Sequence, residues 1–335
     1  MVNLPITIVI PVKNGRDTIL MTLRSLMKQS QLPREVFVID DCSTDGTWEI
    51  LTAFKENNIF AFPLFLHRIQ GGSKGPSHAR NYGISRASSE LIAFIDSDCV
   101  TVKNWLFHLT RPLLHPSCPP ELAGTGGKIK TYWKNLLGEF FEMMSAYKNP
   151  SNLYFLVTAN CCYKKEVLEE IGGFNESMYP GEDAEIGIRL VYRGYKFEYV
   201  PNAIVYNHFP SKIRDLIQKF LGYGAMDYLS YKTEKFIISK TKTFHKPSPF
   251  IKQGEMLLRQ VNLRIMIHLI RKFTKMVLEV FQKNIYLLDA GEFQNKSPQN
   301  LPKTIIFIFF IFLARFSHLR GFIKEYCHDL SNTRN

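Results

Sequence analysis

Residues 91–99 read LIAFIDSDC, and this stretch decides how the rest of the chain is interpreted. Its first five residues are continuously apolar, as in a strand of a parallel sheet that is covered on both faces. Asp96 and Asp98 follow at positions i and i+2, which point to the same side in extended chain. Two such carboxylates could converge on a hard divalent cation such as Mg²⁺ or Mn²⁺. A solvated turn is the alternative interpretation.

Two similar runs lie earlier, ITIVIP at 6–11 and EVFVI at 35–39, and residues 18–27 between them carry apolar side chains at helical spacing. Strands that alternate with helices predict an α/β domain with helices on both faces of the sheet. Ligands of such sheets bind at the carboxyl ends of the strands. Asp41 and the pair at 96–98 both lie at such ends, so a binding site is expected there.

Three further segments carry polar groups at turns. In VIDDCSTDGT (38–47), Asp41 could accept the N3–H of a uracil ring, whereas capping of the next helix alone could explain Ser43 and Asp45. The glycine-rich GGSKGPSHARNYGI (71–84) brings Lys74 and Arg80, whose charges could neutralise phosphate.

Glu182 and Asp183 form the third of these groups, and they precede a predicted helix in YPGEDAEIGIRLVYRGY (179–195). Acids in the first turn of a helix stabilise its dipole, which is the alternative to a catalytic role.

Taken in order, these motifs resemble glycosyltransferase family 2. The resemblance covers about residues 4–210 and rests on ITIVIPVKNG, VIDDCSTDGT, GPSHARNYGI, IDSD, TANCCYKKEVLEEIGGFNE and GEDAEIGIRL. It implies the GT-A nucleotide-diphospho-sugar transferase fold, a Rossmann-like mixed sheet flanked by helices, for a catalytic domain at 1–210. It also implies an inverting transferase of hexosyltransferase type that uses a nucleotide sugar, here a UDP-sugar.

The resemblance implies donor contacts at matching positions. Pro11 and Lys13 match nucleotide-contact positions, Asp41 matches the uracil-binding acid, and Asp96 would contact the ribose. Arg80 is the cation of the glycine-rich segment that we expect on the donor side.

On the reacting side, Asp98 would hold a Mn²⁺ or Mg²⁺ ion between the phosphates, and Asp183 falls where the family places its catalytic base. Asn160 and Glu182 could orient the acceptor. His208 lies where some relatives place a further metal or phosphate ligand, and a structural histidine is equally compatible with its position.

The sequence departs from processive polysaccharide synthases, because no Gln-x-x-Arg-Trp motif follows the GED segment. We therefore expect a transferase that adds one sugar per encounter to a sugar or lipid-linked sugar acceptor, in polysaccharide or glycolipid assembly.

The C-terminal region, 211–335, has a different composition. It holds 21 Lys and Arg against 9 Asp and Glu, whereas residues 1–210 are balanced at 21 each. Apolar residues recur every fourth position over 261–281, with Arg264, Arg271, Lys272 and Lys275 on other faces.

The run IIFIFFIFLA (305–314) is ten residues long, against the roughly 20 that cross a bilayer. A helical, basic extension that lies on a membrane surface is predicted, and a buried helix or strand at 305–314 is the alternative.

The remaining features bound the location and the competing classes. Six scattered cysteines show no disulfide or zinc spacing, and the N-terminus has no signal-peptide pattern, so we expect a cytoplasmic protein, peripheral on the membrane. The tail lacks stacking aromatics in a polar groove, so nucleic acid is not an expected partner. A nucleotidyltransferase and a non-catalytic binding protein that retains the fold are the alternative classes.

Overall fold

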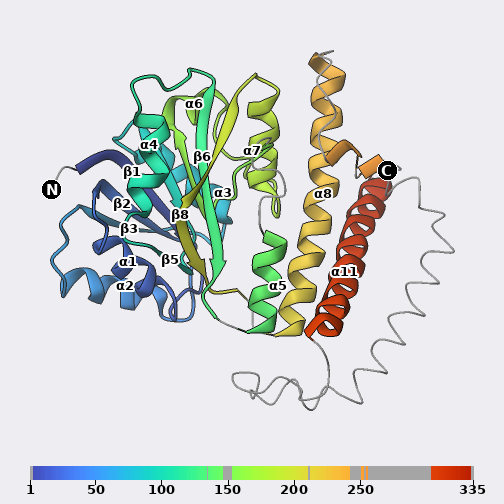
Figure 1. The fold of residues 1–335 in the computed structure, drawn as a ribbon, viewed down its shortest axis with the longest axis horizontal. Helices are drawn as coiled ribbons and strands as arrows, with labels where there is room; N and C mark the ends of the chain where they lie inside the picture. Colours follow the sequence, from blue (N-terminus) through green and yellow to red (C-terminus); the bar gives the residue numbers. More distant parts are fainter. Residues whose placement is uncertain are drawn as a thin grey trace. The chain divides into compact units, whose positions relative to one another are not determined.

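The computed structural model describes residues 3–133, 135–145, 153–209, 212–241, 250–252, 254–255 and 303–332 (Figure 1). The chain divides into two compact units: Met1–Tyr132 with Met144–His208, and Trp133–Met143 with Phe209–Asn335. The sequence gives no signal that 133–143 groups with the later helices. The predicted domain boundary at residue 210 stays a prediction.

The first unit is built on an eight-stranded mixed sheet of order β3-β2-β1-β4-β7-β6-β8-β5. β1 pairs in parallel with β2 and β4, and β2 with β3, so the carboxyl ends of four strands meet at one edge. β7 is antiparallel to β4 and β6, β8 is parallel to β6, and β5 is antiparallel to β8. The strands are β1 (Asn3–Val12), β2 (Leu32–Asp40), β3 (Leu64–Arg68), β4 (Leu91–Ile95), β5 (Cys99–Thr101), β6 (Leu122–Thr131), β7 (Asn160–Lys164) and β8 (Lys196–Asn207).

Six helices of this unit cover the two faces of the sheet. Buried residues of α1, α2 and α4 pack in one apolar cluster with the sheet, and those of α3, α6 and α7 pack in another. The helices are α1 (Ile19–Met27), α2 (Thr47–Glu56), α3 (Pro76–Arg86), α4 (Trp105–Leu114), α6 (Lys165–Glu170) and α7 (Glu182–Val191).

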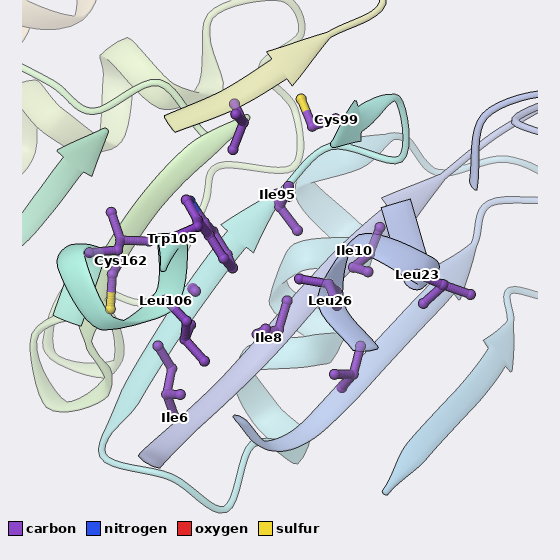
Figure 2. Packing of buried hydrophobic residues seen from close by; sticks show 14 of the residues in the cluster. Ile6, Ile8, Ile10, Leu23, Leu26, Ile95, Cys99, Trp105, Leu106 and Cys162 are labelled. Atoms are coloured by element: carbon purple, nitrogen blue, oxygen red, sulfur yellow. The ribbon is translucent and has the colours of Figure 1, made fainter. Parts of the chain in front are cut away.

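Strand β1 shows why both faces must be covered. Ile6, Ile8 and Ile10 belong to the cluster under α1, α2 and α4. In Figure 2, Ile6 and Ile8 lie on the side of Leu106, and Ile10 lies beside Leu23 and Leu26 of α1. Val9, which alternates with them, belongs to the other cluster. Successive side chains of a strand point to opposite faces, so a continuously apolar strand is stable only between two layers of helices.

The predicted elements at the start of the chain are confirmed. The predicted strand 91–95 coincides with β4, those at 6–11 and 35–39 lie within β1 and β2, and the helix predicted at 18–27 is α1. Gly83 lets helix α3 pack closely on β1. A Cβ at this position would come within 2.4 Å of a methyl carbon of Val9.

The described residues of the second unit lie mostly in helices: α8 (Ile213–Thr241), α11 (Lys303–Asn332) and all but the last two residues of α5 (Leu136–Ser145). α8 and α11 cross closely, since a Cβ at Gly224 would lie 1.8 Å from the carbonyl oxygen of His318. The run 305–314 is part of helix α11, whereas the amphipathic helix predicted at 261–281 lies outside the described residues. Within the described ranges, no helix combines the length and apolar character that crossing a membrane requires.

Candidate functional site

The candidate site lies at the edge where the parallel strands β1 to β4 end. Lys13 follows β1, Asp41 follows β2, the loop 71–75 follows β3, and Asp96 follows β4. The edge lies where the strand order reverses around β1, which is where open α/β sheets bind ligands.

The loops after β1 and β2 are joined by hydrogen bonds. The Asn14 N–H donates to the Ser43 hydroxyl at 2.8 Å, and the Gly15 N–H donates to the Thr47 hydroxyl at 2.9 Å. Asp45 accepts from the N–H of Thr47 at 3.0 Å, at the start of α2. The Ser43 hydroxyl thus joins the two loops and does not cap α2, whereas Asp45 accepts its bond at the start of α2.

Asp41 is held by the glycine-rich loop. Its carboxylate accepts the Lys74 N–H at 2.7 Å, the Ser73 hydroxyl at 2.6 Å and the Gly75 N–H at 3.0 Å. Burial alone would raise the pKa of Asp41, but these three bonds and the nearby charge of Lys13 lower it below its ordinary value. Asp41 is therefore a stable anion that anchors the loop.

The other two predicted nucleotide-contact residues lie next to this arrangement. The ammonium of Lys13 is exposed and donates to the Ser73 hydroxyl at 2.7 Å. Pro11 is partly buried in β1, where it pairs with Ile39 of β2. The structure thus brings Pro11, Lys13 and Asp41 to one end of the edge.

The acids of the D-x-D motif are arranged differently from the extended geometry expected. Residues 96–99 form a turn in which the Cys99 N–H donates to the carbonyl of Asp96 at 3.1 Å. The side chain of Asp96 meets Arg80, and that of Asp98 accepts a bond from Asn207. The chain must turn here because β5 leaves β4 to pair with β8 at the far side of the sheet.

Arg80 is an internal bridge. Its residue is 3% exposed, and its guanidinium donates to Glu182 at 2.8 Å and to Asp96 at 3.2 Å. Burial alone would lower the pKa of Arg80, but the carboxylates of Asp96 and Glu182 outweigh burial and raise it. A buried charge needs such partners, so the guanidinium is committed to the protein, and we explain Arg80 as a bridge instead of a phosphate contact.

The first turn of α7 carries the candidate base. Gly181 precedes it with φ +108°, a conformation that favours glycine, and Glu182 accepts the Gly181 N–H as well as the Arg80 bond. Burial, with the neighbouring Glu182 charge, raises the pKa of Asp183 to about 7, against the lowering influence of Arg80. A carboxylate of this kind can take up a proton near neutral pH.

Asn160 lies in the sheet as a structural connection. It is fully buried, its amide nitrogen donates to the carbonyls of Ala203 at 2.9 Å and Lys128 at 3.0 Å, and its oxygen accepts the Trp105 indole N–H at 2.8 Å. Its side chain is thus used within the protein, so we do not propose for it the acceptor contact expected from the sequence.

The end of β8 closes the site beside Asp98. The N–H of His208 donates to the carbonyl of Asp98 at 3.0 Å, and its ring stacks on Tyr132 with centroids 4.0 Å apart. Burial lowers the pKa of His208, which favours the neutral imidazole that metal binding requires. Asn207, the residue before His208, also belongs to the site and was not predicted from the sequence. Its partner is 109 positions away, and no local pattern links them.

The residues present fit a divalent cation of the Mg²⁺ or Mn²⁺ type. In the described part of the chain, no three His, Cys, Asp or Glu side chains converge as a complete metal site. Mg²⁺ sites commonly use one or two carboxylates while substrate phosphates supply the other oxygens. Asp98, in a turn at the strand-end edge with Asp96 two residues before it, matches that donor set.

The sheet, its helical covering and the acids at this edge define a GT-A fold. Residues 7–172 match the model of the family "Glycosyl transferase family 2", and residues 91–314 match that of "Glycosyl transferase family group 2". The chain belongs to glycosyltransferase family 2, which confirms the resemblance predicted from its motifs.

Curated relatives agree with this family. The pre-mycofactocin glycosyltransferase of Mycobacterium tuberculosis (strain ATCC 25618 / H37Rv) is 27% identical over 237 residues, 66% of this chain and 46% of the relative. A poly-beta-1,6-N-acetyl-D-glucosamine synthase of Staphylococcus aureus (strain MSSA476) is 24% identical over 249 residues, 71% of this chain and 58% of the relative. The chain spans about half the length of these relatives.

Solved structures show the same fold. The mannosyltransferase PcManGT from Pyrobaculum calidifontis, in complex with GDP-Man and Mn²⁺, superposes with a TM-score of 0.64 at 17% identity, over 97% of this chain and 88% of that one. S. aureus TarS 1–349 in complex with UDP-GlcNAc gives 0.50 at 16% identity, over 97% and 92%. The GT-A fold with a helical C-terminal region is therefore confirmed.

Proposed function

We propose that this chain transfers one sugar from a nucleotide-diphosphate sugar to an acceptor hydroxyl with inversion at the anomeric carbon. The observation that carries the proposal is the buried bridge in which Arg80 binds both Asp96 and Glu182. The bridge joins the strand-end acid of the donor edge to the helical turn that bears Asp183. Donor and acceptor chemistry can therefore share one rigid site.

Asp183 is the general base of the proposed reaction. An acceptor hydroxyl must lose its proton as its oxygen attacks the anomeric carbon, and a base is most effective when its pKa lies near the working pH. The raised pKa of Asp183, about 7, meets that condition. Glu182, next to it, accepts the Arg80 bond and so positions the turn from which Asp183 acts.

On the donor side, Asp96 binds the ribose, and Pro11 and Lys13 lie against the nucleotide. Asp98, with His208 beside it, would hold a Mn²⁺ or Mg²⁺ ion, which supplies positive charge that offsets the charge of the leaving diphosphate.

Base recognition falls to Asp41 in this proposal. Both carboxylate oxygens now accept bonds from residues 73–75, so uracil N3–H would replace one of these donors. The choice of a UDP-sugar rests on that exchange. The solved structures support nucleotide sugars as the donor class, since PcManGT is in complex with GDP-Man and TarS with UDP-GlcNAc.

For the acceptor we propose a sugar or lipid-linked sugar that receives one residue per encounter, in polysaccharide or glycolipid assembly. We also propose that the C-terminal region holds the enzyme at the cytoplasmic surface of a membrane, because 21 of its residues are Lys or Arg and 9 are Asp or Glu. Sedimentation with anionic and neutral vesicles tests this. Replacing Arg264, Arg271, Lys272 and Lys275 by Gln should release the protein from anionic vesicles, and unchanged sedimentation would refute the membrane proposal.

A donor panel tests the catalytic proposal. The protein is incubated with UDP- and GDP-sugars in Mn²⁺, in Mg²⁺ or in EDTA, and both thermal stabilisation and release of nucleoside diphosphate are measured. One donor should stabilise the wild type only with metal and be slowly hydrolysed. Asp98→Ala should abolish both effects, whereas Asp17→Ala, at an exposed acid, should change neither. Metal-independent turnover would refute the role of Asp98, and binding without turnover for any acceptor would favour a binding protein.

A further inference from the structure

The residue before His208 contacts the D-x-D motif directly. β5 and β8 pair antiparallel with Cys99 opposite Asn207, which brings the Asn207 amide to the turn after β4. Its Nδ2 donates to Oδ1 of Asp98 at 2.9 Å and lies 3.2 Å from the Cys99 sulfur. Asn207 is 6% exposed, so water competes little for this bond.

The backbone fixes Asn207 from two sides. Its carbonyl accepts the N–H of Tyr132 at 2.9 Å, at the end of β6, and the N–H of the following His208 donates to the carbonyl of Asp98 at 3.0 Å. The amide is therefore held against Asp98 by the sheet itself. A side chain that is locked by its surroundings can hold a neighbouring group in one orientation.

The hydrogen-bond donor to Asp98 is an uncharged amide. Asn207 is neutral, so it directs one oxygen of Asp98 without cancelling the negative charge of the carboxylate. Asp96, by comparison, is paired with the cationic Arg80. A carboxylate that must attract a cation benefits from an orienting partner that leaves its charge intact, and such outer partners of metal ligands influence metal affinity strongly.

We infer that Asn207 is a positioning residue, whose amide holds the Asp98 carboxylate in the orientation that binds a divalent cation together with the diphosphate of the donor. The inference rests on the proposed function, because it assumes that Asp98 binds the cation.

The test measures Mn²⁺ binding instead of turnover alone. Free Mn²⁺ is titrated by electron paramagnetic resonance with full-length protein and UDP, and in a parallel series with GDP. Asn207→Ala removes the amide, and Asn207→Leu removes it while keeping a side chain that branches at Cγ. Asn202→Ala, at an exposed position of the same strand, is the matched control. Melting temperatures establish which variants are folded.

Both Asn207 variants should bind Mn²⁺ about 10- to 100-fold more weakly than the wild type, with Asn202→Ala unchanged. Turnover at saturating Mn²⁺ should recover most of the wild-type kcat, which a general loss of structure would not allow. A folded Asn207 variant with an Mn²⁺ affinity within about threefold of the wild type would overturn the inference and leave the proposed function standing. A wild type that binds no Mn²⁺ with either nucleotide would overturn both.

Discussion

Asp41 and Asp183 lie in two regions of the same site, and their surroundings shift their pKa values in opposite directions. Around Asp41, the loop 73–75 supplies three hydrogen-bond donors, and these lower its pKa. At the start of α7, burial and the charge of Glu182 raise the pKa of Asp183 to about 7.

This difference in pKa determines which role each acid can take in the site. An anion that is stabilised by fixed donors stays charged across the physiological range, which suits anchoring and recognition. An acid whose charged form is disfavoured exchanges its proton near neutrality, which suits general-base catalysis. Substitutions at or near either acid test this difference.

The largest effect is expected from Asp183→Asn. The amide cannot accept the acceptor proton, so transfer should fall by about 10²- to 10⁴-fold, while the donor still stabilises the protein. The variant should also melt at a higher temperature at pH 8. The folded-state pKa of Asp183 lies above 3.8, the ordinary value of an aspartate. The charged carboxylate therefore costs stability at pH 8, and the neutral amide removes this cost.

Initial rates and differential scanning calorimetry check both parts, with the exposed Glu166→Gln as control. A rate near that of the wild type would show that Asp183 is not the base.

The second prediction concerns pH. If Asp183 acts as the base, kcat/KM should decrease about tenfold per pH unit below about 7 and level off above it, because only the deprotonated form accepts a proton. The charge of Arg80 lowers this pKa, so Arg80→Met should move the break in the profile to higher pH. Rates measured from pH 5 to 9 with saturating metal test both statements. A profile that is flat between pH 5 and 7 would contradict them.

The third prediction concerns Asp41, the acid whose pKa is lowered. In Asp41→Asn an amide group replaces one oxygen and faces the donors of the loop, so one or two bonds are lost and stability should fall by about 1–3 kcal/mol at pH 7. The folded-state pKa of Asp41 is lowered, so its contribution is present above about pH 4 and is lost as the pH falls through the folded-state pKa. The difference from the wild type should therefore shrink in acid.

Urea unfolding at pH 7 and pH 3 measures the effect of Asp41→Asn, and Asp17→Asn at an exposed acid is the control. Cleavage of the loop 71–75 by a protease should accelerate in Asp41→Asn alone. Equal stability of variant and wild type at pH 7 would mean that the loop does not depend on Asp41.

These acids also show where prediction from sequence succeeds. The strand 91–95 could be predicted to the residue, because a continuous apolar run that ends in two acids is a local signal. The positions of Asp41 and Asp96 at one edge followed from the parallel order of the strands. What the motifs could not reveal is the set of partners: Arg80 reaches Glu182 across 102 residues, and Asn207 reaches Asp98 across 109. Such contacts depend on the β5–β8 pairing and on the packing of α3 and α7, which leave no local pattern.

The smallest effect is expected from Trp105→Phe. This substitution tests whether the pKa of each acid depends on its local environment alone. The indole N–H donates to Asn160 at 2.8 Å in the buried sheet, and phenylalanine keeps most of the apolar contact but not this bond. Stability should fall by about 1–2 kcal/mol, because the Asn160 oxygen loses its partner.

Trp105 donates to neither Asp41 nor Asp183, so the pH profile of Trp105→Phe should match that of the wild type within experimental error. If the break near pH 7 moved with the melting temperature, the proton affinity of Asp183 would depend on the rigidity of the whole sheet. The contrast between the two acids would then depend on the whole fold and not on the groups next to each carboxylate.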